Sequence, residues 1–192
     1  MISYSFIMNV RYATMGRSGI VSAVLCVCSC LLAAGCGATM TTPPPSLDRV
    51  PWCGTPTIAF QDEGVAPSVT ITDWPHAQPG LNLLPLLPPS LPKGTCLLSA
   101  GGILHDPTFG GRFIITYALP NHGALSIAET PQTVSIASVQ CDTSTLGSTP
   151  LSTCQTTQGG LNITTTGTQS IPELRTLLST LQSGVNWVPQ KS

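Results

Sequence analysis

The chain has 192 residues, a formal net charge of −1 at pH 7 and only 8% charged residues, whereas soluble domains usually carry roughly 25%. This length suits one domain better than two, and the lack of a basic stripe argues against nucleic acid as a partner, because phosphate binding needs clustered Lys and Arg. Hydrophobic residues make up an ordinary 42%, so we expect a core beneath a polar, weakly charged surface.

Residues 1–35 are predicted to be a secretory signal peptide. The uncharged run Ile20–Ala34 follows Arg11 and Arg17 and ends in small residues. A helix needs about 20 apolar residues to span a bilayer, so this run is short for a membrane anchor and typical of a signal peptide. An uncleaved anchor is the alternative. The start codon is left open between Met1, Met8 and Met15.

The segment Leu32-Ala33-Ala34-Gly35-Cys36 resembles the lipobox of bacterial lipoproteins, in which small residues precede an obligatory cysteine. The resemblance implies that the Cys36 thiol takes a diacylglycerol and that the chain is cut before it, so that lipid anchors the protein to the outer face of the cell membrane. One position departs from the family pattern, because Ala33 stands where Leu is commonest. The other leader cysteines, Cys26, Cys28 and Cys30, lack a small residue before them, except for Ser29 before Cys30.

Residues 36–49 are predicted to be a tether that is rich in Thr and Pro. Prolines favour an extended backbone of about 3.1 Å per residue, which would hold a domain away from the bilayer. Low charge, a lipobox and this tether together are typical of an actinobacterial envelope protein.

Four cysteines remain in the predicted domain, which spans residues 50–192: Cys53, Cys96, Cys141 and Cys154. An even number outside the membrane indicates two disulfides, and the Cys-x-x-Cys spacing of zinc and redox sites is absent. Four cysteines allow three pairings. The pair Cys141–Cys154 is favoured because it closes a short Ser- and Thr-rich loop, which leaves Cys53 for Cys96.

The first half of the domain is interrupted by prolines. Short alternating segments lie within 50–60 and 66–74, and the apolar stretch 81–92 contains four prolines that exclude a regular helix or a central strand. Such an apolar stretch either packs over a core or lines a groove. In the second case Leu84 and Leu87 are the expected ligand contacts.

The second half indicates antiparallel sheet. Segments 111–120 and 123–130 flank Asn121-His122-Gly123, a hairpin signal, and two further strands are expected within 132–141 and 159–167. Ser170, Pro172 and Glu173 then have the spacing of a helix start with a capping box. Four leucines share one face of this helix, which Gly184 should end. The fold class is therefore predicted to be α+β, an antiparallel sheet with one C-terminal amphipathic helix and two disulfides.

The order of these segments resembles extracytoplasmic regulator domains of Gram-positive bacteria. PLLPPSLPKGTCLLSAGG is followed by the ITYALPNHGALSIAETP hairpin and by a closing helix, over about residues 84–183. Glu129 stands where that pattern has a polar Gln, and the cysteine pairs are additional. The resemblance, which extends to periplasmic sigma-factor regulators with the lipoprotein-carrier fold, implies a curved sheet around a helix, with a lipid or peptide groove.

Catalytic motifs are missing from the sequence. It has no Gly-x-Ser-x-Gly elbow, phosphate-binding glycine loop or His-Glu-x-x-His motif. The only polar cluster that could hold a metal ion or act in hydrolysis consists of Asp73, His76, His105, Asp106 and His122.

We therefore expect a membrane-anchored, non-enzymatic lipoprotein without cofactor or catalytic residues, a monomer that binds an apolar ligand, either lipid or peptide, or an envelope partner. The alternative is a metal-dependent or hydrolytic envelope enzyme that uses the His and Asp cluster. A surface antigen or spacer without a ligand is a third possibility.

Overall fold

A computed structural model describes Leu47 and residues 50–189. Thr41–Ser192 form one compact unit, within which the predicted domain falls. The predicted signal peptide, the lipobox with Cys36, and nearly all of the predicted tether lie outside the described residues.

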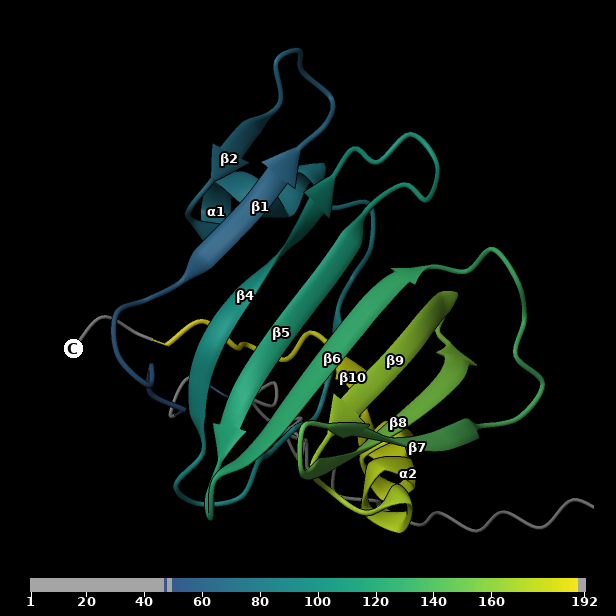
Figure 1. Cartoon of the computed structure of the whole chain (residues 1–192). Helices are drawn as coiled ribbons and strands as arrows, with labels where there is room; N and C mark the ends of the chain where they lie inside the picture. The colour runs from purple at the N-terminus through teal and green to yellow at the C-terminus, as the bar shows by residue number, and fades with distance from the viewer. Residues whose placement is uncertain (1–46, 48–49, 190–192) are drawn as a thin grey trace, which may run out of the picture. The chain divides into compact units, whose positions relative to one another are not determined.

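An eight-stranded sheet forms most of this unit (Figure 1). Its strand order is β2-β1-β4-β5-β6-β9-β8-β7. The strands are β1 (Ile58–Asp62), β2 (Val69–Ile71), β4 (Cys96–Leu104), β5 (Arg112–Leu119), β6 (Gly123–Pro131), β7 (Gln140–Leu146), β8 (Thr149–Gln158) and β9 (Leu161–Gly167). The predicted combination of a sheet with few helices and two disulfides is confirmed at this coarse level.

The sheet is mixed, so the prediction of an antiparallel sheet is wrong in one place. Strand β1 runs parallel to β4, with Ile58 beside Ala100 and Asp62 beside Leu104. Parallel neighbours need a long connection, because the chain must return to the same end of the sheet. Residues 63–95 supply this connection and contain β2, the short helix α1 (Trp74–Ala77), a 3-10 turn and the two-residue strand β3 (Leu86–Leu87).

Strands β6 to β9 form a Greek key, since β9 returns to pair with β6 while β7 lies at the far edge. The chain leaving β6 must pass two strands, a distance of about 14 Å at ~4.8 Å per spacing. Residues 132–139 make this crossing as a loop, so the strand predicted within 132–141 is wrong except at its end. The predicted loop between Cys141 and Cys154 is instead the β7–β8 hairpin, which turns at Gly147.

Alternation along the strands places the apolar side chains on one face of the sheet. In β5 and β6 the buried residues are Phe113, Ile115, Tyr117, Leu125, Ile127 and Glu129. The opposite face carries half-buried Thr and Ser, with Thr116 beside Ser126 and Thr153 beside Thr166. The β5–β6 hairpin turns where it was predicted, but Asn121 and His122, rather than Gly123, adopt positive φ.

Helix α2 (Ile171–Thr180) packs on the apolar face against β8 and β9, where Leu174 and Leu178 are buried. The capping box forms as predicted, because the Glu173 carboxylate accepts hydrogen bonds from both the Ser170 N–H and the Ser170 hydroxyl. The helix is not C-terminal, and it ends before Gly184. The chain turns extended at Leu181 and forms β10 (Gln182–Ser183), which pairs with β3.

Two disulfides join Cys53 to Cys96 and Cys141 to Cys154, which is the favoured pairing. The first attaches the segment before β1 to the start of β4. The second links directly opposed residues of β7 and β8.

Candidate functional site

The proline-interrupted segment 81–92 crosses the apolar face of the sheet and is held there at β3. Strand β3 pairs with β10, and the Leu86 N–H donates to both carboxylate oxygens of Glu129, at 3.1 and 3.0 Å. Leu86 and Leu87 are buried, whereas the preceding Leu84 is 71% exposed. The middle of the segment is therefore held against the sheet, whereas the Leu84 side chain is exposed to solvent.

A first hollow has Leu84 in its lining and lies between the segment and the ends of β6 and β9. Its volume is about 560 Å³. The lining is mainly leucine and proline and contains no charged side chain: Leu81, Asn82, Leu83, Leu84, Leu86, Pro131, Gly159, Gly160, Leu161 and Ser183. Gly159 and Gly160 both have positive φ, and they expose bare backbone at this edge.

A second hollow of about 280 Å³ also has Leu84 in its lining. It is lined by Trp74, Gln78, Leu84, Pro85, Gly184, Val185, Asn186 and Trp187, again without a charge. Its aromatic wall is closely packed, because the Trp74 ring contacts Trp187 at 5.0 Å and Phe113 at 5.9 Å between ring centroids. We call these two hollows, which share Leu84, the Leu84 groove.

The two predicted ligand contacts have different positions. Leu84 lines both hollows, but Leu87 is fully buried in the core and lines neither. The Leu87 side chain is packed in the core, where a ligand in either hollow would not touch it. Leu87→Asp would therefore disturb folding, and a loss of ligand binding in this variant would not show that Leu87 contacts the ligand.

The predicted His and Asp cluster is not assembled into one site. Asp73 caps α1 and bonds His76, three residues along the same turn. His105 instead bonds Asp62, with 2.8 Å between Nδ1 and Oδ1, and Asp106 accepts from the N–H groups of Thr108 and Phe109. Hydrogen bonds from the histidines lower the pKa of Asp62 and of Asp73.

His122 lies at the opposite end of β5 from the loop that carries His105, a separation of roughly 25 Å along the strand. Among the residues that the structure describes, no group of three His, Cys, Asp or Glu is placed to hold a metal ion.

Sequence reasoning assigned no role to the buried pair Glu129 and Tyr117. Burial raises the pKa of Glu129 to about 8, although the hydrogen bond from Leu86 opposes this shift. Burial, followed by the nearby Glu129 charge, raises the pKa of Tyr117, and its hydroxyl has no hydrogen-bond partner among the described residues. The alternation of Leu125 and Ile127 in β6 was the available signal, because it places Glu129 on the same inward face.

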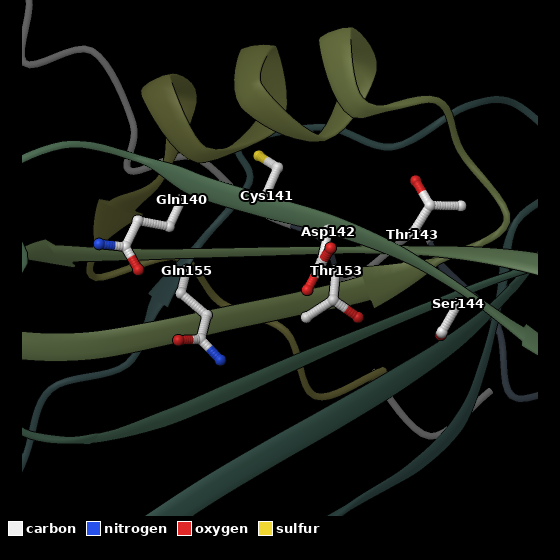
Figure 2. Close-up of a pocket in the computed structure, with 7 residues that line it drawn as sticks. All are labelled: Gln140, Cys141, Asp142, Thr143, Ser144, Thr153 and Gln155. Carbon is white, nitrogen blue, oxygen red and sulfur yellow. The ribbon is translucent and has the colours of Figure 1, made fainter.

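A further hollow, polar and about 450 Å³ in volume, lies over the edge strand β7 (Figure 2). Figure 2 shows Asp142 beside Thr153 and Gln140 above Gln155, all from the β7–β8 hairpin, while the Cys141 sulfur points toward helix α2. Neighbouring residues of β7 thus face opposite sides of the sheet, as alternation requires.

Neither the models of known protein families nor the curated proteins gave a match to this chain. The resemblance to extracytoplasmic regulator domains therefore stays a prediction. Within the described part of the chain, no helix is long and apolar enough to cross a membrane.

Proposed function

We propose that this protein is a membrane-anchored extracytoplasmic lipoprotein without enzymatic activity, which holds an apolar ligand in the Leu84 groove. The observation that carries the proposal is the position of one exposed leucine on the lining of two adjacent uncharged hollows. A single exposed leucine is ordinary on a protein surface. One that lines two uncharged hollows is the point that a ligand lying across both would cover.

The chemistry of the lining favours an apolar, chain-like ligand. Pockets for small ligands usually measure about 300–1,000 Å³ and combine apolar walls with a few polar groups. Asn82 and Ser183 in the first hollow, and Gln78 and Asn186 in the second, are the polar side chains available. A charged head group would find no counter-charge in either lining, so we propose that the apolar part of the ligand occupies the groove.

The alternative of a metal-dependent or hydrolytic enzyme has no comparable support. His76 bonds Asp73, His105 bonds Asp62 from outside the predicted cluster, and His122 lies at the opposite end of β5 from the loop that carries His105. We therefore do not extend the proposal to catalysis.

Native mass spectrometry of residues 41–192, secreted from a bacterial host, tests the ligand proposal. We expect a bound mass that is lost on denaturation, and saturable binding of a fluorescent fatty acid. Leu84→Asp should reduce this binding at least about tenfold, because it places a charge in an apolar site. Val134→Asp is the matched control, since Val134 is 69% exposed in the loop 132–139 and lines neither hollow.

Equal binding by the wild type and Leu84→Asp would contradict the proposal. So would a wild-type domain that shows neither a bound mass nor any uptake of the probe.

A further inference from the structure

The edge strand β7 lacks the features that usually protect a sheet edge from pairing with another chain. Natural edges are kept short or carry Lys, Pro or bulges. The opposite edge, β2, has three residues, whereas β7 has seven, contains neither Lys nor Pro, and pairs with β8 in an unbroken register. Its one charged side chain is Asp142.

The backbone groups that β7 directs away from β8 can be assigned from its register. In an antiparallel pair, opposed residues either exchange both hydrogen bonds, at a Cα–Cα distance of about 5.5 Å, or exchange none, at about 4.5 Å. Cys141 and Cys154 are opposed with a Cα–Cα distance of 4.1 Å, which marks the second kind. The N–H and C=O groups of Cys141, Thr143 and Thr145 therefore point outward, and we call them the β7 edge.

Two observations agree with this assignment. Val139 has the same parity, and its carbonyl accepts from the Arg175 guanidinium of α2 rather than from β8. Outside the β7–β8 ladder, no backbone hydrogen bond from the described residues reaches Cys141, Thr143 or Thr145. As far as the described residues show, the unpaired part of the edge is bounded by Arg175 at one end and by the Gly147 turn at the other.

We propose that β7 pairs antiparallel with β7 of a second copy of this chain, on a two-fold axis at Thr143. In this register each Thr143 faces the other, and Cys141 faces Thr145, so every outward N–H and C=O of the β7 edge gains a partner. Registers shifted by two residues leave part of the edge unpaired. The register centred on Thr143 therefore pairs more of the β7 edge than the registers shifted by two residues.

The side chains fit the same register. Asp142 lies opposite Ser144 of the second copy, so its carboxylate meets a hydroxyl rather than a like charge, which would be unfavourable across a strand pair. Gln140 lies opposite Leu146, whose side chain is 73% exposed in the single chain. The dimer is closed, because the same edge serves both copies and only the short β2 edges are left at its ends. This inference is independent of the Leu84 groove, and it differs from the expectation of a monomer, which the same experiment tests.

Sedimentation velocity of residues 41–192 tests the dimer over a range of concentrations. The wild type is expected to approach twice the monomer mass as concentration rises. Thr143→Lys places two ammonium groups face to face on the axis and should weaken association on the order of tenfold or more at low salt, less at high salt. An equimolar mixture of Thr143→Lys and Thr143→Glu should regain the dimer mass.

Ser144→Lys is the matched control, one residue along the same strand. It would lie opposite Asp142 of the second copy and should leave association unchanged or make it tighter. Melting curves of each variant establish that the domain is folded. A wild type that stays monomeric at every concentration would overturn the proposal. Equal weakening by both lysine substitutions, or a dimer that Thr143→Lys does not affect, would also overturn it, because the interface or its register would lie elsewhere.

Discussion

Glu129 is an ionisable residue in a buried and largely apolar environment. Its carboxyl group is fully buried on the inward face of β6, with Phe113 opposite it on β5 and Ile163 opposite it on β9. The Leu86 N–H is its hydrogen-bond donor, and the Tyr117 hydroxyl is the nearby titratable group. Because burial disfavours the charged form, the folded protein keeps a proton on Glu129 up to a pKa of about 8.

We predict that stability falls as pH rises through this window. The unfolded chain releases the Glu129 proton near the ordinary value of 4.5, while the folded chain holds it to about pH 8. The free energy of unfolding should therefore decrease between these values and level off above, at about 1.4 kcal/mol per pH unit at most. Glu129→Gln keeps an oxygen acceptor for Leu86 and removes the ionisation, so it should be the more stable form at pH 8.5 and similar to the wild type near pH 4.5.

Denaturant unfolding at several pH values measures this difference. Glu173→Gln is the control of opposite sign, because hydrogen bonds from Ser170 lower the pKa of Glu173, and their contribution is lost only as pH falls below its ordinary range. Parallel stability curves for the wild type and Glu129→Gln between pH 5 and 8.5 would show that Glu129 does not titrate as argued.

At the scale of the element, α2 is the clearest success of sequence reasoning. The capping box and the leucine spacing are local, so they could be read without knowledge of the rest of the fold. The end of the helix was predicted too late because the pairing of β10 with β3, a contact between distant segments, draws the chain out of the helix before Gly184.

The contribution of α2 to the core can be measured with two adjacent substitutions. Leu178 is buried against the sheet, and Leu178→Ala should lower the free energy of unfolding by about 2–5 kcal/mol through the lost contacts and the cavity that it leaves. Ser179→Ala, on the exposed side of the same turn, should change it by no more than about 0.5 kcal/mol. Chemical unfolding of the two variants compares them, and similar midpoints would mean that α2 does not pack as described.

The two strand errors have different physical causes. The segment 132–139 has the alternation of a strand, but strand order, which is not local, makes it a crossing loop. By contrast, the first part of β8 is rich in Ser and Thr and was expected to be loop, because its inward residues are Ser152 and Cys154 rather than large apolar side chains. Sequence alone could not tell which leucines of 81–92 face the core, so it did not distinguish the exposed Leu84 from the buried Leu87.

At the scale of the whole molecule, the proposed lipid anchor at Cys36 can be tested directly by fatty-acid labelling. Metabolic labelling with an alkyne fatty acid should mark the wild type and Cys30→Ser, and Cys36→Ser should lose the label and leave the detergent phase. Cys30 is the suitable control because Ser29 makes it the next most acceptable cysteine in the leader. Label retained by Cys36→Ser and lost by Cys30→Ser would move the anchor to Cys30.

The position of Leu47 gives such an anchor a consequence for reach. Leu47 is buried, and its N–H bonds the carbonyl of Asn186 at 2.5 Å, so the chain enters the domain beside its last described residues. From Cys36 to Leu47 the chain can extend at most about 40 Å. A lipid at Cys36 would therefore confine the domain to a shell above the bilayer, with Leu47 no more than about 40 Å from the lipid-bearing residue. Whatever the protein meets, it would have to meet within that shell.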